Sequence, residues 1–161
     1  MPGPVRAYVG LGSNLVDPPG IVRAAMRAID RIPSTRVVSR SRLYRNAPLG
    51  PPQPDYVNAV VALDTMLDPE PLLDALQAIE RAQGRIRDGE RWGPRTLDLD
   101  MLLYGSIELR SARLTLPHPG IASRRFVLQP MHELAPELDI PGIGAIADAL
   151  AALPDSPMVA L

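Results

Sequence analysis

The chain has 161 residues, no cysteine and a formal net charge of −1. This length fits one ordinary domain, so we expect a single domain over residues 1–161. The absence of cysteine excludes disulfides and thiolate metal sites. No apolar run approaches the ~20 residues of a membrane span, and the near-neutral charge argues against an extended nucleic-acid interface. We therefore expect a cytoplasmic protein that binds neither membranes nor nucleic acid.

All 17 basic residues are arginine, because the sequence contains no lysine. A Walker A phosphate loop and a protein-kinase site both need a lysine, and so does a Schiff-base mechanism. These three classes of enzyme are excluded. Any phosphate chemistry in this protein must depend on arginine, metal ions and backbone amides.

The first third of the chain predicts a strand followed by a helix. Residues 5–11 are apolar enough for a short buried strand. Asp17 is a good N-cap, Pro18 suits the first helical position, and Pro33 ends the element. The apolar residues that recur at helical spacing are Val22, Met26 and Ile29.

Two strands are predicted next. Residues 35–45 carry many charges, which suggests a strand near a sheet edge, and residues 46–54 form a loop rich in Pro and Gly. Residues 55–64 form the next strand, in which alternate residues face opposite sides. One side carries Tyr56, Asn58, Val60 and Ala62, and the other carries Val57, Ala59, Val61 and Leu63.

A second helix is predicted to start at Asp68 and Pro69 and to end at the C-cap Gly84. Its buried stripe contains Leu72, Leu73, Leu76 and Ile79, while Gln77 and Glu80 share another face. A polar stretch precedes a strand over residues 96–104. A short β segment near residues 114–116 and a helical tail complete the chain.

The predicted order is β-α-β-β-α-β with a C-terminal extension. This order is typical of an α+β protein with a ferredoxin-like core, in which helices pack mainly on one face of an antiparallel sheet. Because this fold serves many functions, function must be argued from the candidate sites.

Asp98 and Asp100 form the most informative pair of residues. In a strand both point to one face, while Leu97, Leu99, Met101 and Leu103 point to the other. Two carboxylates on one face repel each other unless a cation lies between them, and Mg²⁺ favours such oxygen ligands. A two-metal site and a solvated strand face both fit this spacing.

Five arginines lie within fifteen residues before this strand, at positions 81, 85, 87, 91 and 95. Arginine binds phosphate through two parallel hydrogen bonds, and its charge is permanent. The segment could therefore close over a triphosphate. An ordinary exposed loop with interspersed ion pairs is equally compatible with its composition.

The run from Arg91 to Asp100, RWGPRTLDLD, closely resembles the signature of the 6-hydroxymethyl-7,8-dihydropterin pyrophosphokinases, enzymes of folate biosynthesis. The resemblance covers nearly the whole chain and includes Gly12-Ser13-Asn14, Pro48-Leu49-Gly50, Gln53-Pro54-Asp55-Tyr56-Val57-Asn58, Glu80 with Gly84-Arg85, Pro117-His118, and Arg124 with Phe126. It implies an α/β sandwich around a ferredoxin-like core. It also implies Mg-dependent transfer of the pyrophosphoryl group of ATP to the pterin hydroxymethyl group, which leaves AMP.

The resemblance also implies roles for individual residues. Asp98 and Asp100 would bind two Mg²⁺ ions and act in catalysis with Arg85 and Arg95. The ATP site would contain Gln77, Glu80, Arg85, Trp92, Arg95, His118 and Arg124. The pterin site would contain Leu49, Tyr56, Asn58, Trp92 and Phe126. Two parts of the sequence depart from the family pattern, namely the dipeptide Asn46-Ala47 and Asp88. The implied partners are these two small substrates, and we expect a monomer.

Three other functions compete with this interpretation. Gly10 and Gly12 suggest a Rossmann dinucleotide site, but Leu15 stands at the third glycine position. A ferredoxin-like RNA-binding module would need more aromatic residues than the 4% present. Another two-metal nucleotidyl enzyme would release pyrophosphate rather than AMP.

Overall fold

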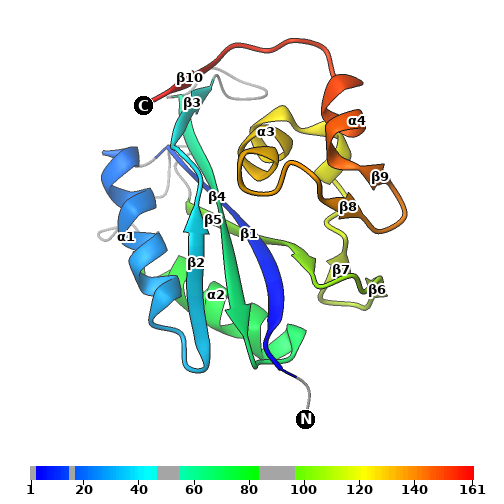
Figure 1. Cartoon of the computed structure of the whole chain (residues 1–161). Helices are drawn as coiled ribbons and strands as arrows, with labels where there is room; N and C mark the ends of the chain where they lie inside the picture. The colour runs from blue at the N-terminus through cyan, green and yellow to red at the C-terminus, as the bar shows by residue number, and fades with distance from the viewer. Residues whose placement is uncertain (1–2, 15–16, 47–54, 84–96) are drawn as a thin grey trace.

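The computed structural model describes residues 3–14, 17–46, 55–83 and 97–161. Within these ranges the elements follow the predicted order β-α-β-β-α-β and continue into a C-terminal extension (Figure 1). The predicted ferredoxin-like core is therefore confirmed. None of the described helices is long and apolar enough to cross a membrane.

The main sheet is antiparallel, and β1 (Val5–Ser13) is one of its interior strands. On one side β1 pairs with β4 (Tyr56–Thr65), and on the other it pairs with β5 (Leu97–Tyr104). β2 (Thr35–Arg40) and β3 (Tyr44–Asn46) follow one another along the outer edge of β4. An antiparallel sheet excludes the Rossmann alternative, which needs parallel strands.

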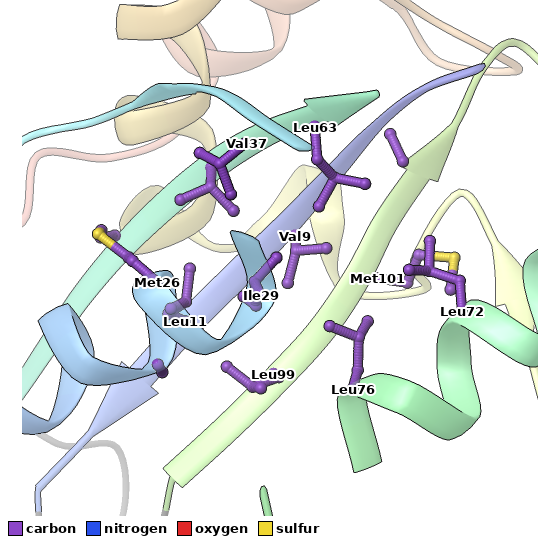
Figure 2. Packing of buried hydrophobic residues seen from close by; sticks show 14 of the residues in the cluster. Val9, Leu11, Met26, Ile29, Val37, Leu63, Leu72, Leu76, Leu99 and Met101 are labelled. Atoms are coloured by element: carbon purple, nitrogen blue, oxygen red, sulfur yellow. The ribbon is translucent and has the colours of Figure 1, made fainter. Parts of the chain in front are cut away.

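Helices α1 (Pro18–Asp30) and α2 (Pro69–Gln83) cover one face of the sheet (Figure 1). Asp17 caps α1 as predicted, because its side chain accepts a hydrogen bond from the backbone N–H of Gly20 at 3.4 Å. Buried apolar side chains fill the space between these helices and the sheet (Figure 2). They include Val9, Leu11, Met26, Ile29, Leu63, Leu72, Leu76 and Leu99.

The C-terminal extension covers the opposite face, so the prediction that helices pack mainly on one face was incomplete. After β6 (Leu109–Arg110), β7 (Thr115–Leu116) and a single 3₁₀ turn, helix α3 (Arg125–Leu134) packs on Tyr8 and Val60. The predicted helical tail is only partly helical. It consists of β8 (Asp139–Ile140), β9 (Gly144–Ala145), α4 (Ile146–Ala151) and β10 (Met158–Ala160). β10 returns to the main sheet and pairs with β3.

The single strand predicted over residues 35–45 is wrong, because the structure divides it into β2 and β3. The register shifts between Val37 and Ser39. The Ser41 hydroxyl then accepts a hydrogen bond from the backbone N–H of Val60 at 2.9 Å, while the N–H of Ser41 donates to the carbonyl of Val60 at 2.9 Å, so a side chain replaces one backbone acceptor there. Regular pairing resumes where Tyr44 lies opposite Asn58.

Leu103 was predicted on the same face as Leu97, and this prediction is also wrong. The register between β1 and β5 shifts at Tyr8 and Val9, which pair with Leu103 and Met101 respectively. The intervening residue, Leu102, therefore adds one position to the strand and reverses the alternation. Leu102 and Leu103 both pack under α3.

Candidate functional site

Asp98 and Asp100 project from the sheet face opposite α1 and α2. Leu97 and Leu99 are buried in the core under those helices, whereas Asp98 is exposed and Asp100 is half-buried. The predicted alternation is thus confirmed around the pair. On β1 the residues directly opposite them are Gly12 and Gly10, which carry no side chain.

A first pocket opens beside this pair, between the sheet and the start of α3. Its polar and aromatic lining comes from four elements and from the residue just before α3. These residues are Asn46, Tyr56, Asn58, Asp98, Asp100, Arg124 and Phe126. The sequence had predicted all of them except Asn46 as site residues, and the fold brings them together.

Asn58 is held in a fixed position at this pocket. Its Nδ2 donates a hydrogen bond to Oδ1 of Asn46. Its own Oδ1 lies so close to Gly12 that a Cβ there would be 2.6 Å away. The absence of a side chain at position 12 therefore permits this close approach of the Asn58 side chain to the backbone. Across the pocket, the Arg124 guanidinium lies 5.9 Å from the centre of the Phe126 ring, within cation–π range.

A second pocket lies on the other side of Asp100, between α2 and the segment that leads to α3. Its polar lining is Gln77, Glu80, Asp100, Ser111, Arg113, Thr115 and His118. Asp100 lines both pockets. A group bound in one pocket and a group bound in the other would therefore meet at this residue.

Glu80 brings a third carboxylate to the site. Its Oε2 accepts a hydrogen bond from the backbone N–H of Leu99 at 2.8 Å. Burial raises the pKa of Glu80, the hydrogen bond from Leu99 opposes this, and the charges of Asp98 and Asp100 raise it further. The site therefore has a negative potential that favours bound cations.

His118 is oriented by two backbone groups. The backbone N–H of His118 donates to the carbonyl of Leu102 at 3.0 Å, and the ring Nδ1 accepts a hydrogen bond from the backbone N–H of Gly120 at 3.0 Å. An accepting Nδ1 places the ring proton of the neutral form on Nε2. Burial and the nearby charge of Arg124 lower the pKa of His118, while Asp100 opposes them, so Nε2–H is available as a neutral donor.

Sequence reasoning missed Arg113. Its Nη2 donates to Asp74 at 2.7 Å and to Gln77 at 3.1 Å, and its Nη1 lies 3.4 Å from Glu70. These contacts hold the guanidinium at the second pocket. The signal available in the sequence was that Arg113 lies two residues before Thr115 and shortly before His118.

Four predicted site residues lie outside the described residues, namely Leu49, Arg85, Trp92 and Arg95. The predicted C-cap Gly84 and the departures at Ala47 and Asp88 lie outside them too.

Asp98 and Asp100 are the residues that could hold a metal. In the described part of the chain no group of three or more His, Cys, Asp or Glu side chains is arranged around one point. Two carboxylates nevertheless fit Mg²⁺, which commonly takes one or two protein oxygens and completes its shell with water and phosphate. The donor set therefore suits a metal that arrives with a phosphorylated substrate.

Fold and site together define a class, namely a ferredoxin-like α/β protein with a carboxylate pair between two polar pockets. The family model for 7,8-dihydro-6-hydroxymethylpterin-pyrophosphokinase (HPPK) matches residues 8–136, and the chain belongs to this family. It is therefore a diphosphotransferase, as the resemblance implied.

Individual relatives agree with this assignment. The chain is 54% identical over 150 residues to 2-amino-4-hydroxy-6-hydroxymethyldihydropteridine pyrophosphokinase of Pseudomonas aeruginosa, covering 92% of each chain. It is 46% identical over 158 residues to the Haemophilus influenzae protein of the same name, covering 98% of each. A crystal structure of HPPK-DHPS in complex with substrates shares the fold, with a TM-score of 0.72 at 12% identity. That match covers 94% of this chain and 43% of the larger one.

Proposed function

We propose that this protein transfers the pyrophosphoryl group of ATP to the hydroxymethyl group of 6-hydroxymethyl-7,8-dihydropterin in folate biosynthesis. The products are the pterin diphosphate and AMP. The observation that carries the proposal is the position of Asp100, which lines both pockets. Two substrates bound in adjoining pockets would present their reacting groups to the same carboxylate pair.

The first pocket is proposed to bind the pterin. Tyr56 and Phe126 supply flat aromatic surfaces, and aromatic stacking favours a planar heterocycle. Asn58, held by its bond to Asn46, offers an amide to the polar edge of the ring. Leu49 and Trp92 are included on the resemblance alone.

The second pocket is proposed to bind ATP. Gln77 and Glu80 lie on its α2 side, and His118 offers a neutral Nε2–H to a phosphate oxygen. Arg113 adds a permanent positive charge that sequence reasoning did not include. Arg124 stands at the first pocket, where it can neutralise charge on the transferred group. Arg85 and Arg95 join this set by resemblance.

Asp98 and Asp100 are proposed to hold two Mg²⁺ ions. When bound, such ions neutralise phosphate charge and lower the pKa of a bound hydroxyl. The two residues keep both substrates close enough to react, and proximity with preorganised charge provides most of the catalysis in phosphoryl-type transfer. The acceptor oxygen bonds to the β-phosphorus, the bond from that phosphorus to the AMP oxygen breaks, and the hydroxyl proton is released.

An assay for AMP release tests the proposal. The protein is incubated with ATP and Mg²⁺, with and without 6-hydroxymethyl-7,8-dihydropterin. We expect AMP only when the pterin is present. Release of pyrophosphate instead would indicate nucleotidyl transfer, and no AMP from protein that binds ATP would show that the acceptor is wrong.

We also propose that the enzyme is a cytoplasmic monomer with one catalytic domain over residues 1–161. Light scattering at micromolar concentration tests the first part, and a dimer mass would contradict it.

A further inference from the structure

The two walls of the first pocket belong to different parts of the fold. One wall is formed by β3 and β4, which carry Asn46, Tyr56 and Asn58. The other wall is the start of α3, with Arg124 and Phe126. A flat molecule between them depends on the spacing of these two walls, because van der Waals attraction is lost within an ångström of extra separation.

Arg125 attaches the C-terminal segment, residues 153–161, to the α3 wall. Its Nη2 donates to the carbonyl of Leu153 at 3.2 Å, and its Nε donates to the carbonyl of Pro154 at 3.3 Å. The Arg125 side chain is only 17% exposed, and Asp155 lies 3.9 Å from its Nη2. Arg125 itself stands between the two pocket residues of this wall.

The other end of the segment attaches to the sheet wall. β10 pairs antiparallel with β3, with Met158 opposite Asn46, and the N–H of Leu161 donates to the carbonyl of Leu43 at 2.9 Å. Asn46 in turn lies opposite Tyr56 on β4. The segment therefore runs from α4 across to the β3 edge of the sheet (Figure 1).

A separate contact joins the C-terminal end of α3 to the start of β3, away from the pocket. There Glu133 accepts a hydrogen bond from the Tyr44 hydroxyl at 2.6 Å and another from the N–H of Arg42 at 3.0 Å. The C-terminal segment supplies the corresponding tie at the pocket end, where Arg125 begins the helix.

We propose that residues 153–161 position the two walls of the first pocket and thereby set its affinity for the acceptor, with Arg125 as a positioning residue. The proposal deepens the function proposed above and rests on it for the identity of the ligand. Neither Arg125 nor β10 lines the pocket, so both would act through the walls they hold.

Three substitutions separate this role from a general loss of stability. Arg125→Ala removes the hydrogen bonds that Arg125 donates to the carbonyls of Leu153 and Pro154, and Arg125→Lys keeps a charged amino group that can donate to one of them. Val159→Pro weakens the attachment to β3, because hydrogen bonds alternate along an antiparallel pair and the bond of Leu161 places the next donor at Val159. Val159→Ala is the matched control, since the side chain is 61% exposed and its N–H is kept.

The binding experiment measures the dissociation constants of the dihydropterin and of ATP for each variant by calorimetry. We expect Arg125→Ala and Val159→Pro to weaken pterin binding about three- to tenfold, which corresponds to part of one charged hydrogen bond, with ATP affinity within about twofold. The pterin affinity of Arg125→Lys should fall between those of Arg125→Ala and the unsubstituted protein, and Val159→Ala should match the latter.

Arg6→Ala is the control for removing an arginine that forms an ion pair away from the pocket, because Arg6 binds Asp64 at 2.6 Å at the other end of β1. Unchanged pterin affinity, or an equal loss for both ligands, would overturn the proposal.

Amide hydrogen exchange keeps the inference separate from the proposed function. Arg125→Ala should speed exchange in β3 as well as at the start of α3, because the segment joins them. Slow exchange in β3 that matches the unsubstituted protein would overturn the positioning role, whatever the ligand. If the unsubstituted protein binds no dihydropterin, the proposed function fails, and the exchange result alone then decides whether the segment holds the walls.

Discussion

The carboxylate of Glu80 accepts a hydrogen bond from the backbone N–H of Leu99 at 2.8 Å, so a charge from α2 is fixed beside β5 at the residue that separates its two aspartates in the sequence. This contact links the helix that lines the second pocket to the strand that lines both. It also places three carboxylates in one region, which raises the pKa of Glu80 beyond the effect of its burial. The cluster is therefore expected to favour cation binding at the expense of stability in the metal-free protein.

The first prediction concerns this cost. A carboxyl group whose pKa is higher in the folded state binds its proton more tightly there than in the unfolded state. For Glu80, the stabilisation from this proton is complete below the pKa of the unfolded state, near 4.5. It is lost as the pH rises through the pKa of the folded state. Glu80→Gln keeps an oxygen that can accept from Leu99 but carries no charge. We expect it to melt higher than the unsubstituted protein at pH 7 with a chelator present, and the difference to shrink as the pH falls toward 4.5.

Melting curves from pH 4 to pH 8 test this expectation. Glu137→Gln is a suitable control, because Glu137 is exposed and lies outside both pockets. A Glu80→Gln protein that is less stable at pH 7, by an amount independent of pH, would show that the charge stabilises the fold. The more stable variant should bind Mg²⁺ and ATP more weakly, as expected when a site is built at a cost to stability.

The second prediction concerns Asp100, which should be the least replaceable described residue. Asp100→Ala is expected to lower the turnover number about 10³-fold or more, because loss of a metal ligand removes several kcal/mol of charge stabilisation. The fold should persist, since the change also relieves repulsion with Glu80. Turnover is followed by AMP release, with Asp148→Ala as the control, because Asp148 is an exposed residue of α4. Near-normal turnover would remove Asp100 from the mechanism.

The third prediction separates the two pockets. Phe126 is half-buried and lines only the first pocket. Phe126→Ala should weaken dihydropterin binding about tenfold or more, in line with the 1–3 kcal/mol of an aromatic stack. Phe126→Tyr keeps the ring and should bind nearly normally, and neither change should move the ATP dissociation constant. Parallel loss of both affinities would indicate that Phe126 only supports the fold.

The local features of the fold could be predicted from the sequence. Alternation along residues 55–64 placed Tyr56 and Asn58 on one face, and the structure confirms this because both line the first pocket. The start of α1 could be predicted equally well, since Asp17 caps the helix with its own side chain and Pro18 occupies the first helical position. In each case the signal resides in residues close together in the chain.

Features that depend on distant partners could not be predicted in this way. The reversed alternation at Leu102 arises from the register between β5 and β1, and the break at Ser41 arises from its bond to Val60. Arg113 gains its place through contacts with α2, 36 to 43 positions away. The return of β10 to β3 likewise has no local signal, because a strand of three residues has too short a pattern to read.

The last prediction tests the close approach at the pocket with two glycines of one strand. Gly12→Ala would place a Cβ 2.6 Å from Oδ1 of Asn58, so the Asn58 amide is expected to move, which strains its bond to Asn46. Gly10→Ala would place its Cβ 3.5 Å from Leu102, an ordinary contact. We expect Gly12→Ala to lower the free energy of unfolding by about 1–3 kcal/mol and to weaken dihydropterin binding.

Gly10→Ala should instead leave stability unchanged or raise it by about 0.4–1 kcal/mol, because alanine reduces the entropy of the unfolded chain. Urea unfolding of the two variants measures the difference directly. Both glycines lie on β1 opposite an aspartate of β5. Any effect that an added methyl group has on the strand in general is therefore common to both variants, and it cancels when their free energies of unfolding are compared. Equal stability of the two variants would show that Asn58 moves without cost, and Asn58 would then not be held in place for a ligand.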